Sequence, residues 1–294
     1  MLTIKRKTKT RRNQRTSSIV SCTFQKMHGL GNDFIVLDLR QQDFAIDKDI
    51  AKSLSNRHTG IGCDQILILR RPSNDRYLAA FEIWNADGSR AEQCGNGVRC
   101  LGLYLHMRAE TPAGQFELAG PAGVIKIECL DNNMVRVEMG QPLFKQQRIP
   151  VLLEAVDGWY PLRLNGKTYR LGAVSMGNPH ALLVVDDLNT IDVTELGAAI
   201  SLNPAFPQGC NAGFAEITDR RNIQLRVFER GAAETSACGS GACAAMTILH
   251  RADLVDQTVN VTQKGGSLTI AWTGGRESVI MTGPATHVYK GTIG

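Results

Sequence analysis

A short cysteine motif occurs twice in this chain, and the repetition constrains the fold more than any other sequence feature. Gln93-Cys94-Gly95-Asn96-Gly97 recurs as Ala237-Cys238-Gly239-Ser240-Gly241, 144 positions later. Self-similarity at a fixed offset is the signature of a repeated structural unit. We therefore expect two similar halves that face each other across a pseudo-twofold axis. Further pairs share nearly the same offset: Gly31-Asn32 with Gly177-Asn178, and Gly62-Cys63 with Gly209-Cys210.

The chain is long enough for the two halves to be separate domains. It has 294 residues, of which 43% are hydrophobic. This length exceeds the roughly 100–200 residues of a usual single domain and supplies apolar material for two cores. We expect the seam near Glu138–Gln141, so that one domain covers residues 22–138 and the other residues 139–282.

Strand patterns outnumber helical patterns in both halves, which predicts an α/β fold dominated by sheets. The expected strands are Tyr77–Trp84, Val124–Cys129, Met134–Met139, Ile223–Phe228, Val259–Thr262, Leu268–Trp272 and Val279–Met281. The expected helices are Lys48–Asn56, Val98–Ala109, Val193–Ser201 and Ala242–Ala252.

The positive charge of the chain is concentrated at its start. The net charge is +5, yet seven basic residues and no acid lie in residues 1–21. The other 26 Lys and Arg face 28 Asp and Glu, so the body gives no support for nucleic-acid binding. No apolar run suits a secretory signal or a membrane span. We expect a disordered extension over residues 1–21, with an organelle-targeting peptide as the alternative, and a soluble body.

The cysteines indicate free thiols rather than a disulfide framework. None of the eight forms a C-x-x-C pair, which removes the usual support for a zinc ribbon or a thioredoxin-like site. A large core without a signal peptide favours free thiols in a reducing compartment, and we expect a cytoplasmic protein without a metal. The eight are Cys22, Cys63, Cys94, Cys100, Cys129, Cys210, Cys238 and Cys243.

Each Cys-Gly-x-Gly turn precedes an expected helix and carries the most specific chemical signal. A helix N-terminus offers free backbone N–H groups, which suit a carboxylate and lower the pKa of a thiol toward neutrality. Inversion of a stereocentre needs two acid/base groups, here the two thiols, that face one cavity. One group removes a proton while the other delivers one to the opposite face. We therefore expect Cys94 and Cys238 to act as an acid and base pair.

Two other interpretations of these turns fail. Gly239-Ser240-Gly241-Ala242-Cys243-Ala244 fits the G-x-G-x-x-A pattern of a dinucleotide loop. However, Glu234-Thr235-Ser236-Ala237 is not a buried strand, and no acid is evident about 20 residues further on. A cysteine protease would use one Cys with a His, which leaves the second turn unexplained.

Polar residues near the repeated turns add to the predicted site. Asn85 and Glu229 are again 144 positions apart, and each lies nine residues before its cysteine. An Asn beside Gly is commonly a turn former, and a Glu-Arg pair is commonly solvated, but repetition favours a shared site. The other candidates are Asn32, Gln65, Asn178, Asn211 and Arg230.

Five motifs together resemble the diaminopimelate epimerase family. The resemblance runs from about Phe24 to the C-terminus with the spacing kept, and it is highly specific. The motifs are Lys26-Met27-His28-Gly29-Leu30-Gly31-Asn32-Asp33-Phe34, Asn85-Ala86-Asp87-Gly88-Ser89, Gln93-Cys94-Gly95-Asn96-Gly97, Ser175-Met176-Gly177-Asn178-Pro179-His180, and Ala237-Cys238-Gly239-Ser240-Gly241-Ala242-Cys243-Ala244-Ala245.

The resemblance implies interconversion of LL- and meso-2,6-diaminopimelate, a step toward lysine and peptidoglycan, without cofactor or metal. Cys94 matches the proton donor and Cys238 the acceptor in the LL-to-meso direction. His180 and Glu229 match residues that tune the thiol pKa values. The matching substrate-binding side chains are Asn32, Gln65, Asn85, Asn178, Asn211, Glu229 and Arg230, and the matching carboxylate-binding loop positions are Gly95, Asn96, Gly239 and Ser240.

The family fold has two similar α/β domains, each a barrel-like sheet around a central helix. The resemblance implies that about residues 283–294 return to the first domain and that the protein is a homodimer, with Tyr289 at the contact. Three residues depart from the usual family sequence, and they leave the packing near Cys238 undetermined: Ala233, Ser236 and Cys210.

Two alternatives stay open at this point. A proline or hydroxyproline racemase has the same fold and also uses two cysteines, whereas a thiol redox or metal-binding protein would need no substrate. Arg230 with Asn85, Asn178 and Asn211 favours a substrate with a second amino-acid centre. We expect this arginine to be buried against the distal carboxylate.

Overall fold

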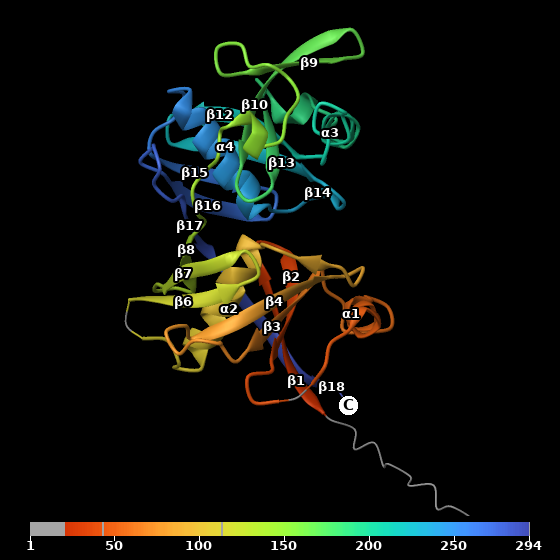
Figure 1. The fold of residues 1–294 in the computed structure, drawn as a ribbon, viewed down its shortest axis with the longest axis vertical. Helices are drawn as coiled ribbons and strands as arrows, with labels where there is room; N and C mark the ends of the chain where they lie inside the picture. Colours follow the sequence, from red (N-terminus) through yellow and green to blue (C-terminus); the bar gives the residue numbers. More distant parts are fainter. Residues whose placement is uncertain (1–20, 43, 113, 294) are drawn as a thin grey trace, which may run out of the picture.

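The computed structural model describes residues 21–42, 44–112 and 114–293. Residues 1–20, nearly all of the basic extension, lie outside the described part. The described chain forms two lobes stacked along the long axis of the molecule (Figure 1). Both lobes combine sheets with few helices, which confirms the predicted α/β class. None of the described helices is both long and apolar enough to cross a membrane.

The first lobe contains most of the N-terminal half. Its elements are β1 (Cys22–Gly29), β2 (Asn32–Asp38), α1 (Lys48–Ser55), β3 (Gln65–Arg70), β4 (Ala79–Asn85), β5 (Arg90–Ala91), α2 (Gly95–Met107), β6 (Gln115–Gly120), β7 (Gly123–Cys129) and β8 (Met134–Glu138). The last strand of the chain, β18 (Thr286–Ile293), returns to this lobe and pairs antiparallel with β1.

The second lobe repeats this series. After the short turn η1 (Gln146–Arg148), its elements are β9 (Tyr160–Leu164), β10 (Lys167–Ser175), β11 (Pro179–Val184), η2 (Leu188–Thr190), α3 (Val193–Ser201), β12 (Asn211–Asp219), β13 (Asn222–Glu229), β14 (Ala233–Thr235), α4 (Gly239–Arg251), β15 (Thr258–Gln263), β16 (Gly266–Ala271) and β17 (Ile280–Pro284).

The strand pairings of the two lobes are the same, which confirms the duplicated unit. In the first lobe β2–β3 and β4–β6 are parallel, while β1–β2, β3–β4 and β6–β7 are antiparallel. In the second, β11–β12 and β13–β15 are parallel, while β10–β11, β12–β13 and β15–β16 are antiparallel.

The lobes join where β8 pairs antiparallel with β17. Arg136 lies opposite Thr282, and these two positions are 146 residues apart, close to the 144-residue offset of the cysteine turns. Nearly equivalent positions of the two lobes therefore face each other in this strand pair. We propose that the boundary between the two domains lies just after β8, close to Glu138.

The central strands of each sheet are apolar throughout, so both faces of the sheet must be covered. In β2, Phe34 and Val36 face the central helix α2, whereas Ile35 and Leu37 face the cluster beneath α1. In the second lobe, α4 takes the central position and α3 covers the outer face. The central helices α2 and α4 contact each other and unite the inner cores of both lobes.

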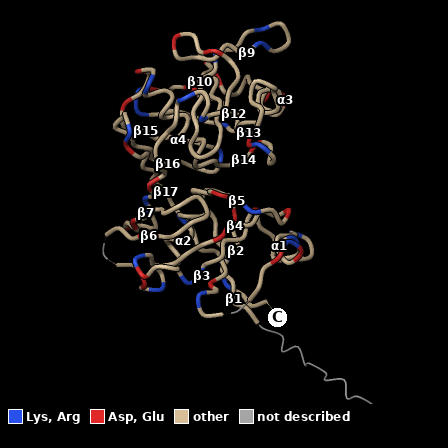
Figure 2. Tube along the Cα trace, viewed as in Figure 1, with Lys and Arg blue, Asp and Glu red and all other residues tan. Residues whose placement is uncertain are grey.

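The two central helices begin three residues earlier than predicted. We expected starts at Val98 and Ala242, whereas α2 begins at Gly95 and α4 at Gly239. The apolar periodicity misses this first turn, because its residues are held by capping and by close approach instead. Acidic and basic residues are interspersed over both lobes (Figure 2).

Candidate active site

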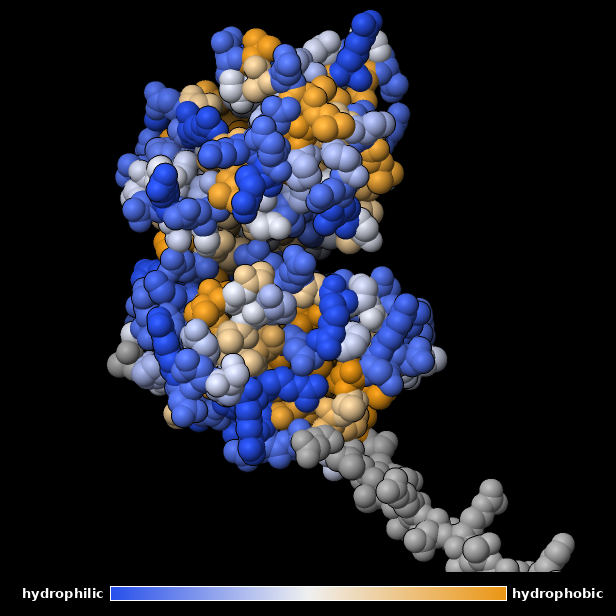
Figure 3. All heavy atoms as spheres, viewed as in Figure 1, coloured by the Kyte–Doolittle hydropathy of each residue, from blue (hydrophilic) through white to orange (hydrophobic). Residues whose placement is uncertain are grey.

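A polar cavity of about 950 Å³ lies between the two lobes. The space-filling view shows the waist between the lobes (Figure 3). Twelve predicted site residues line it: Asn32, Gln65, Asn85, Cys94, Gly95, Asn96, Asn178, Glu229, Arg230, Cys238, Gly239 and Ser240.

Each repeated cysteine caps the N-terminus of a central helix. Cys94 Sγ accepts a hydrogen bond from the Gly97 N–H at 3.4 Å, and Cys238 Sγ accepts one from the Gly241 N–H at 3.4 Å. Both turns pack against the same methionine. A Cβ atom added at Gly95 would lie 2.8 Å from Met281 Cε, and one added at Gly239 would lie 3.1 Å from Met281 Sδ. Glycine thus lets both helix starts approach one point.

The prediction that the thiol pKa values fall toward neutrality at these helix termini is wrong. Burial raises the pKa of Cys94 to about 11 and raises that of Cys238 well above its usual value. The N–H groups of Gly97 and Gly241 act in the lowering direction, but loss of hydration outweighs them. Both cysteines are therefore thiols at neutral pH in this structure.

The two sulfurs have different polar neighbours. Cys238 donates its S–H to Glu229 Oε2 at 3.1 Å, and Thr235 Oγ1 donates to the other carboxylate oxygen at 2.6 Å. The negative charge of Glu229 adds to burial in raising the pKa of Cys238. Cys94 instead faces the amide oxygen of Asn32, at 3.7 Å. Because of this carboxylate, Cys238 holds its proton more strongly than Cys94 does.

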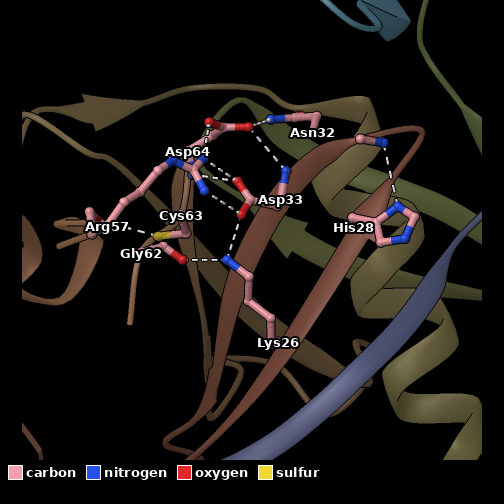
Figure 4. Close-up of polar contacts among 10 residues, drawn as sticks. Lys26, His28, Asn32, Asp33, Arg57, Gly62, Cys63 and Asp64 are labelled. Carbon is pink, nitrogen blue, oxygen red and sulfur yellow. Dashed lines mark hydrogen bonds and ion pairs between the residues drawn. The ribbon is translucent and has the colours of Figure 1, made fainter. Parts of the chain in front are cut away.

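Asn32 is oriented by a charged network that the sequence did not indicate (Figure 4). Its Nδ2 donates to Asp64 Oδ2 at 2.9 Å, and Arg57 Nη2 donates to Asp64 Oδ1 at 2.7 Å. Because a carboxylate only accepts hydrogen bonds, the amide NH₂ must face Asp64 and the amide oxygen must face Cys94. Arg57 and Asp64 also line the cavity.

Behind Asp64, a second carboxylate completes this network. Asp33 accepts hydrogen bonds from Arg57 at 2.7 and 2.9 Å and from Lys26 at 2.5 Å. Burial raises the pKa of Asp33, but the hydrogen bonds from Arg57 and Lys26 outweigh it and hold that pKa well below its usual range. Lys26 and Asp33 belong to a recognised motif, whereas Arg57 and Asp64 had no signal in the sequence.

Asn96 connects the two lobes across the base of the cavity. Its Nδ2 donates to Asn32 Oδ1 at 3.2 Å and to the carbonyl oxygen of Ala237 at 3.0 Å. Both amide hydrogens are thereby used. Its Oδ1 is buried without a hydrogen-bond partner among the described residues.

His180 and Asn211 lie behind the cavity wall rather than on it. His180 Nε2 is 3.0 Å from Asn178 Oδ1 and 3.4 Å from Asn211 Nδ2. Burial, with a smaller contribution from Arg230, lowers the pKa of His180 to about 3, so the imidazole is neutral. Asn211 Oδ1 accepts the Arg230 backbone N–H at 2.9 Å. Both residues support the cavity wall, and their predicted roles toward substrate and thiols stay predictions.

The expectation of a buried Arg230 is wrong in this structure. Arg230 is exposed at the rim of the cavity, and its Nη1 donates to the carbonyl oxygen of Gln208. On the opposite lobe, Gln65 Nε2 donates to Asn85 Oδ1 at 2.8 Å, and Asn85 Nδ2 donates to Ser89 Oγ at 2.9 Å.

Ala233 adopts a left-handed backbone conformation, with φ near 60°, in the strand before Cys238. This conformation favours glycine and is uncommon for alanine. Cys210 is fully buried, and all eight cysteines lie in the described part and have free thiols. Within the described ranges, no group of three or more His, Cys, Asp or Glu side chains is arranged to hold a metal ion.

Comparison with solved structures places this fold. It is similar to a hydroxyproline epimerase from Agrobacterium vitis, with a TM-score of 0.66 and 18% identity over 93% of this chain and 92% of that one. A predicted epimerase from Pseudomonas aeruginosa gives a TM-score of 0.66 at 15% identity, over 92% and 99%. These likenesses show the fold alone. On this fold, one thiol from each lobe reaches a shared cavity.

A family model described as Diaminopimelate epimerase matches residues 24–145 and 172–288. The chain belongs to the diaminopimelate epimerase family. It is 45% identical over 273 residues to the diaminopimelate epimerase of Thioalkalivibrio sulfidiphilus, covering 92% of this chain and 98% of that one. It is 46% identical over 270 residues to that of Xanthomonas axonopodis pv. citri, covering 91% and 95%.

Proposed function

We propose that this protein interconverts LL- and meso-2,6-diaminopimelate by moving protons between the substrate carbon and two cysteines. The observation that carries the proposal is the pair of thiols, one from each repeated lobe, that line the same cavity. Membership of the family supports the substrate. The alternative of a thiol redox or metal-binding protein leaves the polar groups around the thiols unexplained.

The proposed reaction uses the sulfurs on opposite faces of one carbon. In the LL-to-meso direction, Cys238 as thiolate removes the proton and Cys94 as thiol delivers one, and in the reverse direction the roles exchange. Free N–H groups at the starts of α2 and α4 would hold the reacting carboxylate, because negative charge is stabilised there. These groups belong to the turns at Gly95, Asn96, Gly239 and Ser240.

The rest of the substrate would bind farther along the cavity. Asn85 and Asn178 line it from opposite lobes, and Arg230 lies at its rim. The arginine is the charge partner that a distal carboxylate requires. Asn32 and Gln65 would contact the substrate from the first lobe, while Asn211 holds the Arg230 backbone from behind.

We also propose that the protein is a cytoplasmic homodimer that needs no cofactor or metal. The strand β18 pairs, among the described strands, only with β1, so its other edge is free for a partner. Val288 and Tyr289 are exposed there, at 53% and 45%, and Tyr289 packs edge-on against Phe24. An edge strand that exposes two large hydrophobic side chains supports an interface at Tyr289.

Incubation of LL-diaminopimelate in deuterated water tests the proposal. We expect formation of meso product with one solvent deuterium at the inverted carbon. Cys94→Ala and Cys238→Ala should each abolish epimerisation while the protein stays folded. Cys129→Ala, which removes a half-buried thiol outside the cavity, is the matched control. Turnover near wild type in either cavity variant would overturn the two-thiol assignment.

A further inference from the structure

A fully buried arginine lies beneath the active-site turns. Arg99, in the first turns of α2, is 0% exposed. Its Nε donates to the carbonyl oxygen of Pro284 at 3.2 Å, and its Nη1 lies 3.4 Å from Met281 Sδ. Its Nη2 is buried without a hydrogen-bond partner in the described part of the chain. Both hydrogen-bond partners of the guanidinium in the described chain, Pro284 and Met281, are therefore uncharged.

This cation has no carboxylate partner among the described residues, although a buried charge is costly unless it is paired. The ionisable groups that act on Arg99 are three thiols, namely Cys94 and Cys100 on its own helix and Cys243 on α4. A guanidinium stays protonated even when burial disfavours its charge. The base of the site thus carries a positive charge, and within the described residues the groups that can supply its counter-charge are these thiols, as thiolates.

Close packing fixes the position of this charge. A Cβ atom added at Gly29 would lie 3.0 Å from Arg99 Nη2, and one added at Gly283 would lie 3.3 Å from its Nε. Met281, whose sulfur contacts the guanidinium, also packs against the glycine turns of both cysteines. Arg99 is therefore held one side chain beneath the turns, near two helix N-termini that are themselves positive.

We propose that Arg99 is a positioning residue whose buried charge serves as the counter-charge of the Cys94 thiolate. The proposal rests on the two-thiol reaction proposed above. When Cys94 delivers its proton to the substrate carbon, the resulting thiolate and the guanidinium together are neutral. The matching position in the second lobe, 144 residues later, is Cys243, so only one arginine serves the pair. Cys238 faces the carboxylate of Glu229 instead.

The charges around the two thiols agree with this asymmetry. Burial and Glu229 on β13 raise the pKa of Cys94, while the Gly97 N–H and, to a smaller extent, Arg99 on α2 lower it. For Cys238, burial and Glu229 raise the pKa, and Arg99 is not among the largest influences on it. Removal of the guanidinium should consequently affect Cys94 and leave Cys238 nearly unchanged.

The pH dependence of alkylation by iodoacetamide tests this inference, with Cys94 and Cys238 followed separately by peptide mass spectrometry. Arg99→Met keeps an apolar chain but removes the charge, and Arg99→Lys keeps a charge. We expect Arg99→Met to move the Cys94 profile to higher pH, with alkylation at a fixed pH slowed roughly threefold or more. Arg99→Lys should stay closer to wild type. Cys238 in the same molecules is the internal control.

An unchanged Cys94 profile in folded Arg99→Met would overturn the proposal, as would equal shifts at both cysteines. If Arg99→Met does not fold, Arg99→Gln offers a neutral side chain that can still donate to the Pro284 carbonyl, with the same expected shift. The assay contains no substrate. Failure of the proposed epimerase activity would appear in the deuterium experiment, whereas failure of the Arg99 inference would appear only here.

Discussion

The Cys238 sulfur lies 3.1 Å from Glu229 Oε2, whereas its counterpart Cys94 lies 3.7 Å from the uncharged amide oxygen of Asn32. The two halves of the site are thus repeated in backbone but not in charge. A reaction that runs in both directions needs one thiol and one thiolate at a time. The unequal neighbours determine which sulfur loses its proton more readily in the free protein.

Glu229→Gln should lower the pKa of Cys238, because the glutamine keeps a hydrogen-bond acceptor but removes the negative charge that opposes the thiolate. The alkylation profile of Cys238 should move to lower pH, and epimerisation should slow about tenfold or more. Glu234→Gln is the control, since Glu234 lines the cavity but pairs with Arg226 and Lys264. Equal Cys238 profiles in the two variants would contradict the prediction.

Mild oxidation should inactivate the protein reversibly through a Cys94–Cys238 disulfide. Both sulfurs line one cavity. Proton transfer on opposite faces of one substrate carbon requires the two sulfurs to lie close together, so that they can form a disulfide when the cavity is empty. Activity should return with reductant, and Cys94→Ala should abolish the cross-link. Peptide mapping of oxidised, inactive protein that found both thiols free would rule out this bond as the cause.

Arg230→Lys should weaken substrate use while leaving the fold intact. The side chain is exposed at the rim, so its loss costs little stability, but an ammonium lacks the planar fork that binds a carboxylate with two hydrogen bonds. We expect kcat/KM for diaminopimelate to fall roughly 10- to 100-fold, mainly through KM. Arg163→Lys, on an exposed position of β9, is the control.

The same assay should include lysine and proline as substrates. Both lack the distal carboxylate, so wild-type protein should use them far less efficiently than diaminopimelate. Efficient turnover of proline would replace the proposed substrate with that of a racemase. If Arg230→Lys behaved as wild type, the distal carboxylate would have to bind elsewhere in the cavity.

His180→Gln should flatten the acid side of the stability profile. Burial lowers the pKa of His180 from 6.5 to about 3. Between these values the unfolded chain binds a proton that the folded protein excludes. The free energy of unfolding therefore decreases as the pH is lowered, by up to ~1.4 kcal/mol per pH unit. The variant removes this loss. Urea unfolding at several pH values would measure it, with the exposed His58→Gln as control, and equally steep profiles would contradict it.

The sequence by itself determined the duplication, the α/β class and the family. These follow from local patterns: the repeated Cys94 and Cys238 turns, the strand periodicity, and motifs that are contiguous along the chain. A repeat offset also predicted that the two cysteines face one cavity, because duplicated units pack symmetrically. The second-lobe helix Val193–Ser201 was predicted with its observed bounds, since its capping and periodic residues are adjacent in sequence.

Only the tertiary structure decided the electrostatics of the site. The thiol pKa values depend on burial, which the turn sequence does not contain, and burial reversed the predicted direction at Cys94. Asp64 orients Asn32 from 32 positions away, and Arg99 meets Met281 from 182 positions away. Such contacts are set by how sheets and helices pack, and no local pattern marks them. Charge placement in a folded interior is a property of the whole chain, because hydration and distance are fixed only once every element is in place.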